Sequence, residues 1–137
     1  MTITYDVNRA ITAAEFIEVL AHSSLGARRP LDDVETMEGM VKNADLTVTA
    51  WDGDVLVGVS RSITDFHYAC YLSDLAVKET YQGMGIGKKL MQLTNDQLGH
   101  HCKLLLISAP AASEYYPKVG FERNERAWEL PRGKQIG

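Results

Sequence analysis

The sequence contains few cysteines and prolines and has no excess of positive charge. Its 137 residues include two cysteines and four prolines, too few for a disulfide framework or a proline-rich linker. Fourteen Lys and Arg against 18 Asp and Glu give a net charge of −4, which argues against a nucleic-acid partner. Cys70 and Cys102 are therefore interpreted as reduced thiols in a cytoplasmic protein.

Long apolar runs are also missing from the sequence. No stretch reaches the ~20 apolar residues of a membrane span, and the N-terminus does not resemble a signal peptide. We therefore expect no membrane partner. A hydrophobic content of 45% is sufficient for one packed core, so residues 1–137 are predicted to form a single domain.

The sequence does contain a glycine-rich turn at residues 82–87, Gln-Gly-Met-Gly-Ile-Gly. It follows the apolar run 70–77, which predicts a buried strand, and it precedes a segment with apolar residues at helical spacing. A strand, a glycine turn and a helix N-terminus together form an anion site, because main-chain N–H groups and the helix dipole favour negative charge. Lys88 and Lys89 add formal positive charge. The turn therefore predicts a site for a phosphate group.

Two common phosphate-binding motifs do not fit this spacing. The P-loop requires a glycine where Gln82 stands and a Ser or Thr where Lys89 stands. The dinucleotide-binding fingerprint requires a third glycine where Lys88 stands. The spacing that fits is Q-x-x-G-x-G, which resembles the coenzyme A pyrophosphate loop of the GNAT acetyltransferase superfamily.

The resemblance to the GNAT superfamily extends to both sides of the turn. Residues 74–77, Asp-Leu-Ala-Val, are similar to the strand that precedes the loop in that family. Residues 115–121, Tyr-Tyr-Pro-Lys-Val-Gly-Phe, resemble the family's F-Y-x-K-x-G-F segment. A narrower similarity links residues 61–65, Arg-Ser-Ile-Thr-Asp, and the later Asp74 to a subgroup that includes arylalkylamine acetyltransferases.

The resemblance implies a GNAT-like α/β (α+β) fold. We expect one mixed, mostly antiparallel sheet of six to seven strands, splayed between strands 4 and 5 and flanked by about four helices. Periodicity and turn signals indicate helices at 12–22, 30–42, 86–99 and 113–119. They indicate strands at 3–7, 46–51, 55–63, 70–77, 104–108, 121–123 and 127–130.

Acetyl-CoA is the co-substrate that the resemblance implies, with no metal. The cofactor-binding residues that it implies are Leu75, Ala76, Val77, Gln82, Gly83, Met84, Gly85, Ile86, Gly87, Lys88, Ser108 and Tyr116. A metal site at His100, His101 and Cys102 is not predicted, because no second ligand cluster occurs at metal-binding spacing.

Two residues are candidates for proton transfer. Tyr116 matches the family tyrosine that donates a proton to the departing thiolate; the alternative is a packed aromatic side chain. Asp74 lies next to the predicted thioester site and is the candidate base for the amine; the alternative is a structural hydrogen-bond acceptor. Cys102 has no convincing base partner, which favours direct attack in a ternary complex over an acyl-enzyme.

The resemblance implies that the acceptor enters opposite the cofactor, between the first two helices and the start of the fourth strand. The candidate substrate-binding residues are Arg28, His67, Tyr68 and Tyr71. The tyrosines offer π-faces to a cationic or aromatic amine. For Arg28 and its neighbour Arg29 a solvated basic loop is the preferred interpretation, and for His67 a solvated turn. We expect a small-molecule primary amine as substrate. The alternatives are a protein lysine or N-terminus, or a non-catalytic CoA-binding regulatory module, and the sequence is compatible with a homodimer.

Overall fold

The computed structural model describes residues 2–137. The chain divides into two compact units between Ile107 and Ser108. The larger unit contains the sheet and the α-helices of the described residues, and the smaller unit contains two short 3₁₀ turns. Each unit is described by itself below.

The sheet of the larger unit has five strands in the order β1-β2-β3-β4-β5. The strands are β1 (Ile3–Val7), β2 (Leu46–Asp52), β3 (Val55–Thr64), β4 (Ala69–Val77) and β5 (Lys103–Leu106). The pairs from β1 to β4 are antiparallel, whereas β4 and β5 run parallel. The sheet is therefore mixed and mostly antiparallel, as predicted.

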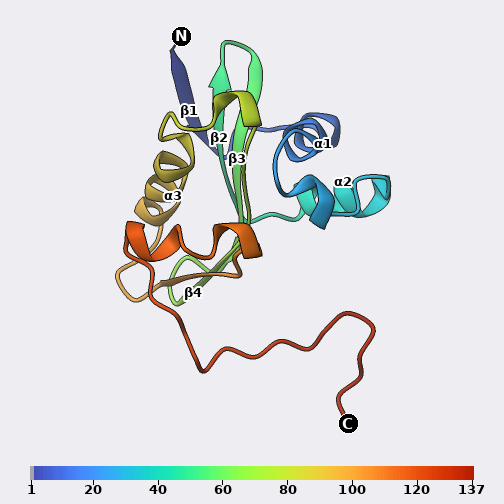
Figure 1. The fold of residues 1–137 in the computed structure, drawn as a ribbon, viewed down its shortest axis with the longest axis vertical. Helices are drawn as coiled ribbons and strands as arrows, with labels where there is room; N and C mark the ends of the chain where they lie inside the picture. Colours follow the sequence, from blue (N-terminus) through green and yellow to red (C-terminus); the bar gives the residue numbers. More distant parts are fainter. Residues whose placement is uncertain (1) are drawn as a thin grey trace. The chain divides into compact units, whose positions relative to one another are not determined.

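Three α-helices cover the two faces of this sheet: α1 (Ala13–Ala21), α2 (Val34–Lys42) and α3 (Ile86–Asp96). Figure 1 shows α3 on one face and α1 with α2 on the other. The Thr12 side chain caps α1 by accepting the Glu15 N–H at 3.0 Å, and the Glu15 carboxylate accepts the Thr12 N–H in return. Asp33 caps α2 with its carboxylate, which accepts the Thr36 N–H at 3.1 Å. This cap explains why α2 begins at Val34 and not at Pro30.

Each face of the sheet has its own apolar core. On the α1 and α2 face the buried side chains include Phe16, Leu20, Met37, Trp51, Val59 and Ala76. On the α3 face they include Leu46, Val48, Ala50, Val57, Ile86 and Leu90. Since β2 and β3 contribute to both cores, they are buried at nearly every position, polar residues such as Thr49 and Ser60 included.

The strand and helix counts that the resemblance implied are too high. The sheet has five strands, because residues 121–137 form neither the expected hairpin at 121–123 and 127–130 nor any other regular element. The expected hairpin has few apolar residues, because the polar run Glu-Arg-Asn-Glu-Arg at 122–126 takes up most of its first strand and the turn. An isolated hairpin of this kind is marginal in water. The short helix expected at 113–119 is a 3₁₀ turn at Tyr116–Val119, since Pro117 lacks an N–H donor.

Strand β4 loses its neighbour on one side halfway along its length. The parallel pairing with β5 runs from Ala69 to Leu72, where Leu72 lies opposite Leu106. Among the described strands only β3 pairs with the rest of β4, residues 73–77. The other edge of that segment therefore presents main-chain groups that no described strand pairs. The splay between strands 4 and 5 that the resemblance implied stays a prediction.

Candidate active site

The glycine-rich turn joins β4 to α3, and its path depends on two glycines. Gly83 has φ = +79° and Gly85 has φ = +77°, a left-handed conformation that other residues adopt only with strain. A Cβ at either position would meet no atom within 4 Å, so the constraint is backbone conformation and not crowding. Gly87 lies outside that region, and its Cβ would be an ordinary 3.8 Å from the Val77 side chain.

The start of α3 presents main-chain donors without helical acceptors. The Lys89 N–H donates to the Gly85 carbonyl at 3.1 Å, so the amides of residues 86–88 precede the first α-helical bond. Gly85 is the N-cap, and no side-chain oxygen accepts from these donors. The positive end of the helix dipole and the exposed Lys88 add to the same field. This arrangement fits the pyrophosphate of coenzyme A.

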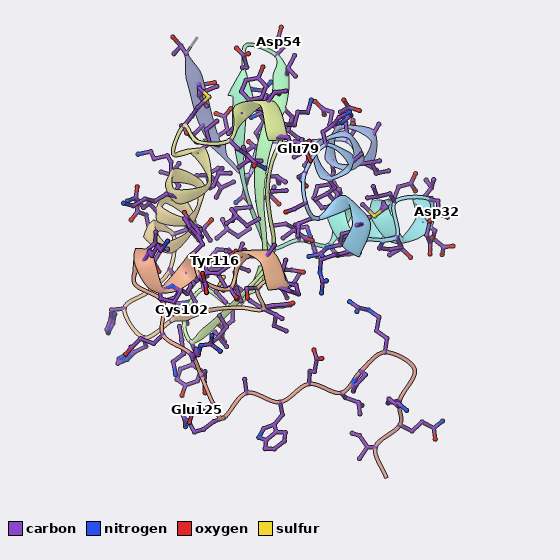
Figure 2. The ribbon with its side chains drawn as sticks, in the orientation of Figure 1. Asp32, Asp54, Glu79, Cys102, Tyr116 and Glu125 are labelled. Atoms are coloured by element: carbon purple, nitrogen blue, oxygen red, sulfur yellow. The ribbon has the colours of Figure 1, made fainter. Side chains whose placement is uncertain are left out.

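Two side chains fix the path of the chain into the turn. The Gln82 amide donates from Nε2 to the Val77 carbonyl at 3.1 Å, which anchors the turn to the end of β4. The Tyr81 hydroxyl donates to the Asp52 carboxylate at 2.6 Å, and this bond raises the pKa of Tyr81. Asp52 is the last residue of β2, and the turn that follows it carries Asp54 at its tip in Figure 2. The turn is thus fixed to two parts of the sheet.

The predicted cofactor-binding strand segment, residues 75–77, has its side chains in the two cores. Ala76 is 3% exposed in the core beneath α1. Leu75 and Val77 pack against the core beneath α3. Because these side chains pack in or against the two cores, a ligand at the unpaired edge of this segment would meet main-chain groups. Main-chain contact is what the resemblance implied for the pantetheine.

Asp74 lies at the centre of a buried ion-pair cluster. Its side chain is fully buried, and one carboxylate oxygen accepts the Arg29 Nε–H while the other accepts the Arg61 Nε–H, each at 2.5 Å. We call Arg29, Asp74 and Arg61 the Asp74 cluster. Since both carboxylate oxygens already have charged donors, this geometry favours the structural interpretation of Asp74 over the base. The base role itself stays a prediction.

Arg61 pairs with Asp74 and not with Asp65, although Asp65 is only four positions away in the sequence. The Asp65 carboxylate instead accepts the main-chain N–H groups of residues 67–69 at 2.8–3.1 Å. These bonds, strongest from Tyr68, lower the pKa of Asp65 to about 2. Asp65 therefore stabilises the tight turn that leads into β4.

Tyr71 lies on the same face of the sheet as the Asp74 cluster. It pairs with Ile63 on β3 and with Leu105 on β5, and the three side chains are 40–44% exposed. Ile63 follows Arg61 by two positions, so both side chains point to the same face. An open apolar row of Ile63, Tyr71 and Leu105 therefore lies beside the charged cluster.

The other three candidates for the acceptor site do not lie beside the Asp74 cluster with Tyr71. His67 and Tyr68 lie in the turn before β4, where the Tyr68 side chain is 74% exposed, about 20 Å along the strand from Asp74. Arg28 is exposed, and only its carbonyl contacts the cluster, by accepting from Arg29. Sequence reasoning named Arg29 beside Arg28 in the acceptor loop but missed its contact with Asp74. Two adjacent arginines in one loop give no signal for which of them turns inward.

Tyr116 and Ser108 belong to the smaller unit. Tyr116 opens a 3₁₀ turn, and its ring makes edge-to-face contacts with Tyr115 at 5.4 Å and Phe121 at 5.5 Å between centroids. Burial, and then the neighbouring Tyr115, raises the pKa of the Tyr116 hydroxyl above its ordinary value of 10.0. The hydroxyl therefore carries its proton at neutral pH, as a proton donor must. The pairing of Tyr116 with the thiolate stays a prediction.

Residues 2–137 contain neither a metal-binding cluster nor a helix that could span a membrane. No group of three or more His, Cys, Asp and Glu side chains in this part of the chain could bind a metal ion. His100 and His101 lie against each other, with ring centroids 4.2 Å apart. None of the described helices is both long and apolar enough to cross a bilayer.

A mixed, mostly antiparallel sheet with a glycine turn at a helix N-terminus defines an α/β protein with a built anion site. The sequence matches the Acetyltransferase (GNAT) domain family over residues 18–129, so the chain belongs to the GNAT acetyltransferases. Members of this family use acetyl-CoA. The family match is to the GNAT domain as a whole, and the arylalkylamine subgroup stays a prediction.

Solved structures of acetyltransferases share this fold at low sequence identity. A probable acetyltransferase from meticillin-resistant Staphylococcus aureus is 24% identical with a TM-score of 0.77, covering 98% of this chain and 100% of that one. A GNAT family protein from Streptococcus pneumoniae is 22% identical with a TM-score of 0.73, covering 96% and 99%. An aminoglycoside N-acetyltransferase in complex with CoA is 15% identical with a TM-score of 0.68, covering 98% of each chain. A comparison with curated protein sequences finds no match.

Proposed function

We propose that this GNAT acetyltransferase transfers the acetyl group of acetyl-CoA to the primary amine of a small molecule by direct attack in a ternary complex. The observation that carries the proposal is the turn at Gly83 and Gly85. Its left-handed backbone leads the chain from the unpaired edge of β4 to the free amides of α3. Main-chain donors at a helix N-terminus bind a diphosphate, and a strand edge binds an extended amide-containing arm.

The residues of the chain divide the work of the reaction between binding and proton transfer. When bound, acetyl-CoA supplies the thioester. The amides of residues 86–88 and Lys88 hold the pyrophosphate, and the main chain of residues 75–77 orients the arm. A C–N bond forms to the amine as the C–S bond breaks. Tyr116, whose hydroxyl carries its proton at neutral pH, gives that proton to the leaving sulfur. The proton that the amine loses returns to Tyr116 through solvent, so the chain ends unchanged.

The acceptor side supports a small amine with an apolar part. The row of Ile63, Tyr71 and Leu105 is open and apolar, with exposures of 40–44%. It lies on the face that carries the Asp74 cluster. An amine with an aliphatic or aromatic body can pack on this row, and its ammonium can lie over the Tyr71 ring before deprotonation. A bound cation of that kind also suits a chain with a net charge of −4.

Free-thiol release from acetyl-CoA tests this function directly. The protein is assayed with a panel of small aliphatic and aromatic amines and, in parallel, with peptides that carry a lysine or a free N-terminus. We expect thiol release with at least one small amine and none above background with the peptides. Release with peptides alone would replace the small-molecule proposal by protein acetylation. Binding of acetyl-CoA without release in either panel would indicate a CoA-binding regulatory module.

A further inference from the structure

Ser73 is the residue at which β4 loses regular pairing on both sides. On one side, Arg61 lies opposite Asp74 and Ser62 lies opposite Leu72, which leaves Ser73 as the extra residue of a β-bulge. On the other side, the pairing with β5 ends at Leu72. The direction of the unpaired edge beyond this point therefore depends on what fixes Ser73.

Two arginine side chains bind the polar groups of Ser73. Arg29, from the loop between α1 and α2, donates from Nη2 to the Ser73 carbonyl at 2.9 Å. Arg61, from β3, donates from Nη2 to the Ser73 hydroxyl oxygen at 3.0 Å. These guanidinium groups supply to the bulge the donors that a neighbouring strand would otherwise supply.

Asp74 connects the two arginines and makes the arrangement rigid. Its oxygens accept from Nε of both, so each guanidinium binds Ser73 and Asp74 with neighbouring nitrogens. Arg61 also donates to the Met40 carbonyl at the end of α2, at 3.3 Å. Planar guanidinium groups with several donors in a fixed fork are suited to such linking, whereas lysine is not. The cluster thus joins the α1–α2 loop, α2, β3 and β4 at one buried point.

We propose that the Asp74 cluster positions the active site: Arg29 and Arg61, linked by Asp74, fix the bulge at Ser73 and so the direction of the unpaired edge of β4. Asp74 acts here as a positioning residue and not as the base. The structural part stands on the contacts above, and only its kinetic consequence rests on the proposed function. A loosened bulge misdirects the main chain of residues 75–77 and leaves the pyrophosphate turn intact.

Hydrogen exchange of the peptide covering residues 71–78 tests the structural part without any substrate. Arg29→Gln removes the guanidinium, and Arg28→Gln is a matched control, because the Arg28 side chain is exposed and makes no hydrogen bond in the described structure. We expect Arg29→Gln to speed exchange in this peptide about 10- to 100-fold, as for the loss of charge-assisted hydrogen bonds, and Arg28→Gln to change it less than about twofold. Equal exchange in both variants would overturn the proposal.

Kinetics separate positioning from proton abstraction. We expect Arg29→Gln to lower kcat about 10-fold or more while the acetyl-CoA affinity measured by calorimetry stays within about threefold of wild type. Asp74→Asn should lower kcat by a similar factor at every pH. If Asp74→Asn recovers at high pH and Arg29→Gln has no kinetic effect, Asp74 is the base and the proposal fails. If Asp74→Asn does not fold, Arg29→Gln decides alone.

The two proposals fail in distinguishable ways. An absence of thiol release with every amine in the wild-type protein contradicts the proposed function and leaves the exchange experiment unaffected. Turnover in the wild type together with unchanged exchange and unchanged kcat in Arg29→Gln contradicts the positioning role alone.

Discussion

The glycine turn and the Asp74 cluster are built in opposite ways. The turn is made of consecutive residues, and its function comes from main-chain amides that two left-handed glycines expose. The cluster is made of side chains separated by 45 and 13 positions in the sequence, and its geometry exists only after β3, β4 and the α1–α2 loop have packed. A site of the first kind can be recognised from spacing alone, whereas a site of the second kind cannot.

Gly85→Glu tests whether the main chain of the glycine turn binds the cofactor, and it has the largest expected effect. The substitution places a side chain at φ = +77° and a negative charge at the anion site. We expect acetyl-CoA affinity to fall by more than about 100-fold, since strain and charge act together. Calorimetry with acetyl-CoA measures the affinity, and circular dichroism verifies the fold.

Gly87→Ala is the matched control for that substitution. Its Cβ would be 3.8 Å from Val77, and Gly87 lies outside the left-handed region, so we expect affinity within about threefold of wild type. Unchanged affinity in Gly85→Glu would show that the turn does not bind the cofactor. The assignment of the glycine turn and its neighbours as cofactor-binding residues would then lose its main support.

Tyr116→Phe gives the next largest expected effect and tests the proton donor. The change removes one hydroxyl and almost no volume, so kcat should fall about 10²–10⁴-fold while acetyl-CoA affinity stays nearly constant. Tyr115→Phe is the control on the adjacent residue, and we expect it to retain most of the activity. Equal rates in the two variants would assign Tyr116 to packing.

The larger unit of the fold was predictable because its signals are local. Strands β1 to β4 and helices α1 and α3 follow from alternation, capping residues and helical spacing, and the hairpin between β2 and β3 follows from Asp52-Gly53. The C-terminal strands were not predictable in the same way. The segments 121–123 and 127–130 carry only a few apolar residues among charged ones. Such segments depend on packing partners, and local propensity cannot show whether a partner is present.

The site residues show the same difference between local signals and long-range contacts. Gln82 and the glycines were recognised from spacing, and the structure gives Gly83 and Gly85 the backbone that the anion site needs. Asp74 was recognised as unusual, but its partners were not. Arg61 is near Asp65 in the sequence, whereas the β-bulge at Ser73 places it opposite Asp74. A bulge has no reliable sequence signature, so long-range partners remain hidden until the register is known.

Tyr71→Ala tests the side-chain part of the comparison, with an effect smaller than those above. Loss of the ring from the row with Ile63 and Leu105 should raise the amine KM about 10-fold and leave the acetyl-CoA KM unchanged. Tyr68→Ala is the control, because Tyr68 lies in the turn before β4 and is 74% exposed. The sequence treats both tyrosines alike, whereas the structure predicts that only Tyr71 matters. An equal rise in both variants would place the acceptor nearer the turn.

The smallest expected effect concerns Asp65, whose contacts are as local as those of the glycine turn but serve stability. Its main-chain hydrogen bonds lower its pKa from 3.8 to about 2. A folded-state pKa below the unfolded value contributes stability above pH 3.8, and this contribution is lost as the pH falls toward 2. Asp65→Asn should therefore lower Tm near neutral pH, and the difference from wild type should shrink between these pH values. Asp54→Asn, at the exposed hairpin tip, is the control. A difference that stays constant with pH would show that the negative charge of Asp65 is not what stabilises the entry into β4.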